Sequence, residues 1–417
     1  MILRKLRTAA SLVARFAVKA WARVRNYAKK RGRHYGKRTV WAWKDVAERA
    51  RNARLALVNH TRKGVESALN LRKPVIRFVR RTERTAKIRA VEREERGVER
   101  LAIRLAASDR PLVLGPWISE VGFEVLYWIP FLAWLKTMAQ WDSANVIAVS
   151  RGGVRSWYHG LSDTYVEIFD CLSPEEFARR NESRREAAEG VHKQMDLSDL
   201  DRDLIRLAAQ KAGLTDPVVI HPSLMYRLFR FFWLGHRPLI YVEERTRFSR
   251  REGPAGLSLH GLPRDYVAVK AYTAQSLPDT PRNRQVLRAI VEQLTRTTNV
   301  VTLDTGLALD DHDDYRLDQN PRVFSVANQL TPPNNLEVQT AVIAGASAFV
   351  GTCGSLTWLA PMLGVPTVAL MSDPRFLRAH LYLARHVYSA IGAANFSTVD
   401  VNAVDHLRLD LTPPVGR

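Results

Sequence analysis

Cysteine and long apolar runs are what this sequence has least of. Its 417 residues include only two cysteines, Cys171 and Cys353, which are too few for a disulfide framework, and no Cys or His cluster has the spacing of a zinc site. No stretch reaches the roughly 18 uninterrupted apolar residues that a membrane-spanning helix needs, and the N-terminus lacks the apolar segment of a secretory signal. We therefore expect a protein of a reducing compartment, the cytosol, without a membrane span.

Signatures of the common nucleotide-binding and nucleic-acid-binding folds are also missing. No Gly-Lys-Ser or Gly-Lys-Thr closes a P-loop, and no Gly-x-Gly-x-x-Gly run follows an expected strand. RNP, KH and zinc-finger patterns are absent as well. These absences disfavour ATP-driven motors, dinucleotide oxidoreductases and sequence-specific nucleic-acid binders, so nucleic acid is not the expected partner. Charge alone still permits non-specific binding to a polyanion.

Acidic residues are absent from the first 44 positions, which sets the N-terminal segment apart. Residues 1–105 hold 31 Lys and Arg against 8 Asp and Glu, whereas residues 106–417 hold 32 against 34. The net charge of +21 therefore belongs to a basic N-terminal arm, and the remainder is nearly neutral. Apolar residues in the arm recur every three or four positions, as on one face of an amphipathic helix, at Ile2, Leu6, Ala9, Val13, Phe16, Ala20, Val24 and Tyr27.

Aromatic residues among the cations of the arm favour attachment to a membrane surface. Trp21, Tyr35, Trp41 and Trp43 stand among Lys and Arg, as expected where rings lie at the headgroup boundary and cations meet lipid phosphate. The hypothesis is that residues 1–44 attach the protein to the anionic cytoplasmic face of a membrane. Contact with another polyanion, an organellar transit peptide and a partner-binding helix are the alternatives for this segment.

Beyond the arm, short apolar strands alternate with helices in two series, which predicts parallel sheets. In the first series we expect strands at 112–114, 145–150 and 217–221, helices at 123–138 and 197–212, and a helix with a following extended piece in 224–243. In the second we expect strands at 266–271, 299–303, 322–326, 348–352 and 366–371, and helices at 283–297, 336–344 and 358–363.

This alternation predicts an α/β protein with two Rossmann-like domains facing each other across a cleft. The expected boundaries are an arm of residues 1–105, a first Rossmann-like domain of residues 106–262, a second Rossmann-like domain of residues 263–405 and a tail of residues 406–417. In such folds a ligand binds at the carboxyl ends of the strands.

The most informative segment is Ala346–Ser372, in which a strand ends in a turn of small residues that leads into an expected apolar helix. A strand-to-helix turn leaves backbone N–H groups unpaired at the positive end of a helix dipole, and small side chains let a ligand come close to them. The pattern indicates an anion site, for which a phosphate group is the natural occupant. Close packing of a β-α-β unit would require the same small residues, which is the alternative interpretation.

Four short motifs carry a family resemblance. They are Asn334–Gln339 (NNLEVQ), Ala348–Ser355 (AFVGTCGS), Leu359–Pro361 (LAP) and Gly364–Pro366 (GVP). Together they resemble the nucleotide-sugar half of GT-B glycosyltransferases, especially the heptosyltransferase and fucosyltransferase-like branches. Heptosyltransferases tend to have Asp-Thr/Ser-Gly before a His-containing helix, whereas this chain has Thr-Cys-Gly-Ser followed by Trp358. The resemblance therefore implies a nucleotide-activated donor but leaves its sugar open.

Several residues are candidates for binding that donor. The turn and Lys270, at the end of an expected strand, would meet the diphosphate, Asp304 and Thr305 would hold the nucleoside, and Glu337 is either a helix-start carboxylate or a contact to donor hydroxyls. The candidate donor-binding residues are Lys270, Asp304, Thr305, Glu337, Gly351, Thr352, Cys353, Gly354 and Ser355.

Two carboxylates are candidates for the base that accepts the proton of the acceptor hydroxyl. Glu120 and Glu124 lie in the sequence GPWISEVGFE, directly after the first expected strand. In a GT-B arrangement this loop faces the donor, and Glu120 is the first choice. Helix capping or an ion pair with Arg151 is the structural alternative for it.

An acidic run near residue 312 is interpreted as a solvated loop rather than a metal site. Asp310, Asp311, Asp313 and Asp314 surround His312, but neighbouring aspartates in a polar loop are ordinarily just hydrated, and the resembled enzymes do not depend on a metal that bridges the donor. We therefore expect no cofactor beyond the nucleotide-sugar co-substrate.

The sequence as a whole predicts a glycosyltransferase that acts at the cytoplasmic membrane face. It would move a sugar from a nucleotide-diphosphate donor to a surface-glycan or lipid-linked acceptor. A polysaccharide pyruvyltransferase-like enzyme on the same framework and a non-catalytic sugar-nucleotide or polyanion-binding protein are the alternatives. The donor, the acceptor, the stereochemical outcome and the oligomeric state are left open.

Overall fold

The computed structural model describes residues 89–188, 193–307, 313–315 and 320–403. Residues 93–417 form one compact unit and residues 1–92 another, so nearly all of the predicted basic arm lies outside the described residues. A described helix over residues 89–106 leads into the first domain, and its Val98, Ala102 and Ala106 are buried in the core. No helix of the described part has the length and apolarity needed to cross a bilayer.

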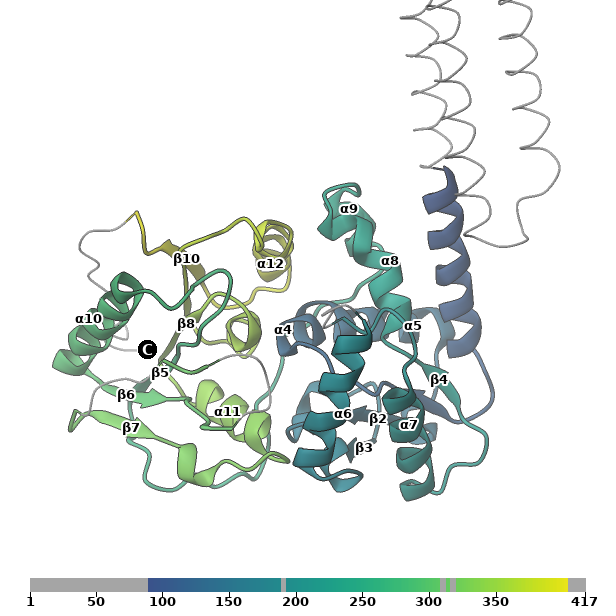
Figure 1. Ribbon diagram of the computed structural model, residues 1–417, viewed down its shortest axis with the longest axis horizontal. Coiled ribbons are helices and arrows are strands. Elements are labelled where there is room, and N and C mark those ends of the chain that lie inside the picture. Colours follow the sequence, from purple (N-terminus) through teal and green to yellow (C-terminus); the bar gives the residue numbers. More distant parts are fainter. Residues whose placement is uncertain (1–88, 189–192, 308–312, 316–319, 404–417) are drawn as a thin grey trace, which may run out of the picture. The chain divides into compact units, whose positions relative to one another are not determined.

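The first domain is built on a four-stranded parallel sheet with the strand order β3-β2-β1-β4 (Figure 1). Its strands are β1 (Leu112–Leu114), β2 (Val146–Ser150), β3 (Thr164–Glu167) and β4 (Val218–Ile220). Its helices are α4 (Val121–Phe123), α5 (Ile129–Ala139), α6 (Pro174–Ala187), α7 (Asp199–Lys211), α8 (Ser223–Trp233) and α9 (Leu239–Glu243). Because β1 is flanked by β2 on one side and β4 on the other, the chain reverses direction across the sheet between β1 and β4.

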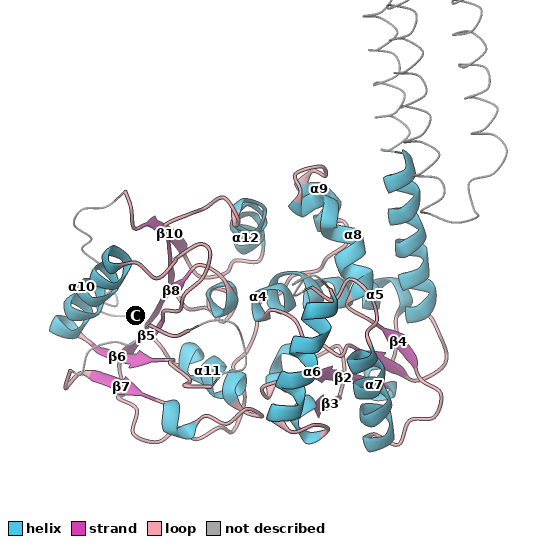
Figure 2. Cartoon of the chain, viewed as in Figure 1, coloured by secondary structure: helices cyan, strands magenta, loops and turns pink. Residues whose placement is uncertain are grey.

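The second domain is a six-stranded parallel sheet in the order β10-β9-β8-β5-β6-β7 (Figure 2). Its strands are β5 (Tyr266–Lys270), β6 (Asn299–Thr302), β7 (Val323–Ser325), β8 (Ala348–Thr352), β9 (Thr367–Met371) and β10 (Phe396–Asp400). Its helices are α10 (Pro281–Thr297), α11 (Asn335–Ala344) and α12 (Arg378–Ala390). The corresponding reversal lies between β5 and β8.

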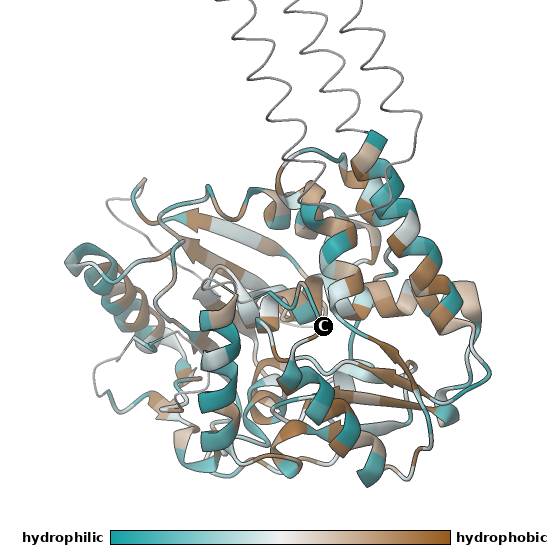
Figure 3. Cartoon of the chain, turned by 45° about the vertical axis from the view of Figure 1, so that its right-hand side comes forward, coloured by the Kyte–Doolittle hydropathy of each residue, from teal (hydrophilic) through white to brown (hydrophobic). Residues whose placement is uncertain are grey.

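Two parallel sheets with flanking helices confirm the predicted fold class of two Rossmann-like domains. The expected strands are present with small shifts at their ends, and β3, α6, α12 and β10 were not predicted. The strands of both sheets are largely hydrophobic, whereas the outer helices carry hydrophilic residues on their exposed faces (Figure 3). In a parallel sheet covered by helices both faces are buried, which explains why these strands appear in the sequence as continuous apolar runs.

Two local predictions are wrong. The extended piece expected at the end of 224–243 is the short helix α9, which follows a turn at Gly235. The α-helix expected at 358–363 is a 3-10 helix, η6 (Ser355–Trp358), followed by turns. Ser355, with φ of 44°, and Gly354, with φ of 143°, prevent a regular helix from starting there.

The helix expected at 123–138 forms in three pieces. A π-helical segment, η1 (Glu124–Trp128), separates α4 from α5. Such segments are often associated with functional sites because they displace one side chain from the regular helical pattern. The Trp128 ring stacks against Trp117, which in turn stacks against Tyr226 of α8. This aromatic cluster fixes the loop after β1 against α8.

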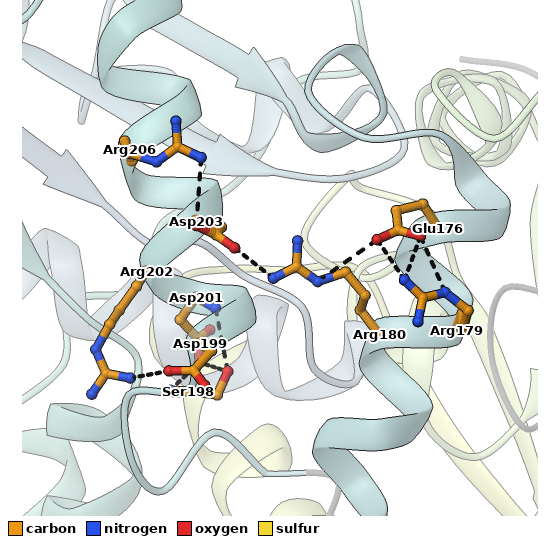
Figure 4. Close-up of polar contacts among 9 residues, drawn as sticks. All are labelled: Glu176, Arg179, Arg180, Ser198, Asp199, Asp201, Arg202, Asp203 and Arg206. Carbon is orange, nitrogen blue, oxygen red and sulfur yellow. Dashed lines mark hydrogen bonds and ion pairs between the residues drawn. The ribbon is translucent and has the colours of Figure 1, made fainter.

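Charged residues join α6 to α7 on the outer side of the first sheet. Arg180 Nη2 of α6 donates to Asp203 Oδ2 of α7 over 2.6 Å, and Ser198 and Asp201 form a capping box at the start of α7 (Figure 4). The capping box explains the sharp start of α7, since each side chain satisfies a backbone N–H that the helix leaves unpaired.

One continuous hydrophobic core links the two domains. It includes Tyr127 and Phe229 from the first domain and Phe349, Trp358 and Leu383 from the second. Hydrogen bonds cross the same contact, from Trp157 Nε1 to Thr340 Oγ1 over 3.1 Å and between Tyr127 and His380 over 2.7 Å.

Candidate functional site

The reversal points of the two sheets bring their loops into direct contact. In open α/β sheets, ligands bind outside the carboxyl ends of strands at such a reversal. The loop after β1 leads into α4, and the turn after β8 leads into η6. A Cβ atom on Gly122 of α4 would lie 3.0 Å from the backbone N of Ser355 and 3.1 Å from Cδ1 of Trp358. The loop that carries the two candidate bases and the turn predicted to bind a phosphate therefore contact each other.

The turn after β8 exposes backbone amides toward this meeting place. The N–H groups of Gly354, Ser355 and Leu356 donate to no other described residue, whereas the N–H of Cys353 donates to Leu370 O over 2.8 Å. Gly354 is required by two features, its φ of 143° and the Tyr272 hydroxyl, which would lie 2.7 Å from a Cβ at this position. The turn can thus present the amides of Gly354, Ser355 and Leu356 to an anion, whereas the amide of Cys353, which the sequence also suggests for this role, is used within the sheet.

Thr352 and Cys353 hold the turn in place rather than face outward. Thr352 Oγ1 donates to Tyr272 O and accepts from Tyr272 N, both over 2.9 Å. Gly351 pairs with Lys270 across the neighbouring strands. Cys353 is buried, and burial raises the pKa of its thiol to about 12, so it stays protonated at neutral pH.

Lys270, Asp304 and Thr305 lie at the carboxyl ends of β5 and β6, next to the turn in the sheet order. Lys270 Nζ donates to Leu303 O and forms an ion pair with Asp314 Oδ1, each over 2.7 Å. Asp314 Oδ2 also accepts from the N–H of Thr305 over 2.8 Å. Asp314, a residue of the acidic run, thus compensates the positive charge of Lys270. Asp304 accepts a hydrogen bond from the Thr302 hydroxyl.

Asp310, Asp311 and His312 lie outside the described residues. The backbone of Asp313 is hydrogen-bonded to Thr273: its N–H donates to Thr273 Oγ1 over 3.2 Å, and its carbonyl oxygen accepts from Thr273 N over 2.9 Å. Among the residues that the structure describes, no group of three or more His, Cys, Asp and Glu side chains is arranged to hold a metal ion.

Glu337 lies at a second contact between the domains. The N–H groups of Leu336 and Glu337, in the first turn of α11, donate to Gly152 O over 2.9 Å each. A Cβ on Gly153 would lie 2.9 Å from Cβ of Glu337. Partial burial raises the pKa of Glu337, and Arg155 opposes this shift. The structure therefore places Glu337 against the Arg151–Gly153 loop of the first domain.

The two predicted carboxylates of the first loop differ in exposure. Glu120 directly precedes α4 and is exposed, and its carboxylate makes no hydrogen bond to another described residue. The charge of Glu120 raises the pKa of Lys193, so the two groups lie close enough to interact. Glu120 is two residues before Gly122, whose Cβ position lies 3.0 Å from Ser355 N. Glu120 is therefore an exposed carboxylate on the segment that contacts the turn after β8.

Glu124 is fully buried instead. Its Oε1 accepts from Ser150 Oγ over 2.6 Å and from the Tyr158 hydroxyl over 2.7 Å, while Oε2 has no hydrogen-bond partner among the described residues. Burial raises the pKa of Glu124 from 4.5 to about 7, and the hydrogen bonds and Arg151 only partly oppose the shift. Of the two predicted carboxylates, only Glu120 is exposed to solvent.

Lys193 is a site residue that the sequence did not reveal. Its Nζ lies 4.9 Å from the ring centres of both Phe123 and Trp233, and it donates no hydrogen bond to another described residue. Desolvation lowers its pKa, and Glu120 raises it. An ammonium group held by rings and one nearby carboxylate keeps its N–H donors available for a ligand anion. No motif surrounds Lys193, and the only signal was the aromatic composition of 224–243.

His380 completes this aromatic surrounding. Its ring packs edge-on against Phe123 and Tyr127, and its Nδ1 pairs with the Tyr127 hydroxyl over 2.7 Å. Burial, reinforced by the charge of Lys193, lowers the pKa of His380 to about 3. The imidazole is therefore neutral at physiological pH, and Lys193 is the cation of this part of the site.

Comparison of the chain with protein-family models and with curated proteins finds no match. Similar solved structures include the iron-containing dodecameric glycosyltransferase TibC of enterotoxigenic E. coli, at 13% identity and a TM-score of 0.38, covering 65% of this chain and 62% of TibC. They also include E. coli ADP-heptose LPS heptosyltransferase II, at 13% identity and a TM-score of 0.36, covering 69% of this chain and 89% of that one. A family 9 glycosyltransferase of Veillonella parvula aligns at 14% identity with a TM-score of 0.37, covering 70% and 86%.

Proposed function

We propose that this protein is a glycosyltransferase that uses a nucleotide-diphosphate sugar. The observation that supports it best is the contact of two segments: one carries exposed Glu120 with Lys193 close to it, and in the other the amides of Gly354, Ser355 and Leu356 donate to no other described residue. Glycosyl transfer from such a donor needs both functions at one place, a proton acceptor and groups that stabilise the departing diphosphate.

In the proposed reaction an acceptor hydroxyl attacks the anomeric carbon of the donor sugar. A new carbon–oxygen bond forms as the bond between the anomeric carbon and the phosphate oxygen breaks. Glu120 takes the proton of the attacking hydroxyl, and the nucleoside diphosphate leaves with the electron pair of the broken bond. The amides of the turn and Lys193 stabilise the negative charge that develops on the leaving oxygen. This assignment corresponds to transfer with inversion.

The buried groups around this site would position the reacting ones. Trp117 and Trp128 stack beneath the loop after β1, and Glu124 ties that loop to Ser150 and Tyr158. Thr352 anchors the turn after β8 to Tyr272. Both loops thereby approach the donor on supported backbones, which lowers the cost of orienting the reactants.

The proposed setting is the cytoplasmic face of a membrane. The motif resemblance favours a surface glycan or a lipid-linked saccharide as acceptor, and the basic, aromatic character of residues 1–44 favours peripheral attachment to anionic lipid.

A ligand screen followed by a single substitution tests the reaction. A nucleotide-diphosphate sugar should raise the melting temperature of the full chain, because a ligand that binds the native state stabilises it. With the donor so identified, Glu120→Gln should lower kcat about a thousandfold while changing the donor Kd by less than about threefold. The matched control Asp199→Asn, on the exposed start of α7, should leave both constants unchanged.

Each result has a different meaning for the proposal. Equal turnover of Glu120→Gln and the unmodified protein would rule out Glu120 as the base. Stabilisation by phosphoenolpyruvate and by none of the nucleotide sugars would favour the pyruvyltransferase-like alternative. Binding of a nucleotide sugar without turnover on any glycan or lipid-linked acceptor would favour a binding protein.

A further inference from the structure

Four large apolar side chains stand exposed on one part of the compact unit, which we call the exposed apolar edge. They are Leu234, Ile240, Phe376 and Tyr382, with exposed fractions of 64%, 54%, 55% and 63%. Leu234 and Ile240 lie in the turn after α8 and in α9, whereas Phe376 and Tyr382 lie before and within α12. Neighbouring exposed apolar side chains of this size are uncommon on a soluble surface and mark contact sites.

Contacts between the helices hold the two halves of this edge together. His386 Nε2 of α12 lies 2.6 Å from Glu243 Oε1 of α9. Ile240 is one helical turn before Glu243, and Tyr382 is one turn before His386, so each of the two apolar side chains lies one turn from this contact. Figure 1 shows α9 and α12 along the same border of the molecule.

Exposed cations accompany the apolar side chains. Arg378, Tyr382 and Arg385 are all exposed and follow the i, i+4, i+7 spacing, which places them along one face of α12. An aromatic ring between two arginines suits the boundary between lipid headgroups and acyl chains. A partner with an apolar interior and an anionic surface complements both parts of this face.

The first helix of the compact unit contacts the same elements. Glu94, the second residue of the unit, pairs with Arg230 of α8 over 3.0 Å. Two further ion pairs of the same helix follow, Glu95 with Arg237 over 2.5 Å and Glu99 with Arg245 over 3.0 Å. The chain therefore enters the unit beside α8, and exposed Leu234 lies one helical turn beyond Arg230.

We propose that the exposed apolar edge is a second membrane contact, which inserts into the headgroup region of an anionic bilayer and orients the catalytic unit toward it. The arm alone would tether the unit without fixing its direction. Insertion of Leu234 and Ile240 beside the point where the arm enters, and of Tyr382 between its two arginines, adds this orientation. The inference rests on the membrane setting proposed above but not on the proposed reaction.

Amide hydrogen exchange of the full chain with and without vesicles tests the proposal. Vesicles that contain phosphatidylglycerol should slow exchange in peptides that cover residues 231–243 and 374–386, and vesicles of phosphatidylcholine alone should not. Residues 131–145, which include exposed Met138, serve as the internal reference and should not change. Unchanged exchange at both edge peptides in vesicle-bound protein would overturn the proposal, because the arm would then be the whole attachment.

A variant with Leu234→Ser, Ile240→Ser, Phe376→Ser and Tyr382→Ser should bind these vesicles about tenfold more weakly, since four apolar side chains no longer enter the interface. The matched control, Met138→Ser with Leu197→Ser, removes exposed apolar side chains elsewhere and should bind as the unmodified chain does. Equal binding by the fourfold variant would contradict the proposal. A change in its mass by light scattering with unchanged vesicle binding would instead assign the edge to contact between copies of the chain.

Discussion

The loop after β1 and the turn after β8 lie against each other but contribute different chemistry. The loop after β1 carries ionisable side chains, exposed Glu120 and buried Glu124, on an aromatic support that also holds Lys193. The turn after β8 contributes backbone amides, and its own side chains are small or are used to anchor it, as with Thr352. In the proposed reaction, proton transfer would therefore belong to the first domain and anion binding mainly to the second.

This division explains the composition of each segment. A group that must exchange a proton needs a side chain with a suitable pKa, whereas a phosphate can be held by amides that never titrate. The second domain can hence use glycine where the ligand must come close. The first domain surrounds its ionisable groups with rings, because rings support a cation without neutralising it.

The largest expected effect concerns Glu124, the buried ionisable group of the loop after β1, and its contribution to the pH dependence of stability. The carboxyl of Glu124 has a pKa of about 7 in the folded chain against 4.5 for the unfolded one. Between these values the native state binds the extra proton, so Glu124 stabilises the fold fully below pH 4.5, and this contribution is lost as the pH rises through 7. The shift corresponds to about 3 kcal/mol.

Glu124→Gln should remove this dependence, because the amide oxygen still accepts from Ser150 and Tyr158 but cannot ionise. The drop in the free energy of unfolding from pH 5 to pH 8 should become smaller by about 3 kcal/mol, measured by urea unfolding at both pH values. The exposed control Glu182→Gln should retain the original slope. An unaltered slope in Glu124→Gln would mean that the buried carboxyl does not titrate in this range.

The next largest effect is expected from a substitution that distorts the turn after β8. Gly354→Ala would force a side chain into φ of 143° and toward the Tyr272 hydroxyl, 2.7 Å away, at a cost of about 1–3 kcal/mol. We expect a lower melting temperature and, by calorimetry, donor binding about tenfold weaker. Gly97→Ala, at a position with no atom within 4 Å of the new Cβ, is the control. Unchanged donor binding in a folded Gly354→Ala protein would argue against the turn as the anion site.

The smallest effect tests whether the first domain also contributes to anion binding. Lys193→Met keeps an unbranched apolar side chain against Phe123 and Trp233 but removes the charge. Donor binding should weaken several-fold, by less than in Gly354→Ala because one cation of the site is lost while the three amides stay. Lys211→Met on α7, whose partner is Asp170 on the surface, should bind donor normally. Equal donor affinity for Lys193→Met and the unmodified chain would place the anion site entirely in the second domain.

The sequence predicted most of the fold because the strands are short apolar runs separated by helices with clear starts. The sequence did not predict the π-helical segment at Glu124–Trp128, because the apolar pattern of 123–138 is equally typical of one regular helix. The elements β3, α6, α12 and β10 were missed because their apolar residues are mixed with charged ones.

The candidate site was only partly visible in the sequence. Glu120 and the Gly351–Ser355 turn could be found because each follows a buried strand. The sequence could not predict which N–H groups of the turn are already hydrogen-bonded. The N–H of Cys353, for example, donates to Leu370 of the neighbouring strand β9. Lys193 was missed since its surroundings come from α4, α8 and α12, which are far from it in sequence.

The sequence by itself determined the two α/β series, the basic arm and the small-residue turn, because alternation, charge and residue size are local properties. Only the tertiary structure decided which carboxylate is exposed, which amides of the turn have no partner among the described residues, and which aromatic rings surround Lys193. Those outcomes depend on burial and on hydrogen-bond partners from other strands and helices, and no spacing along the chain encodes them.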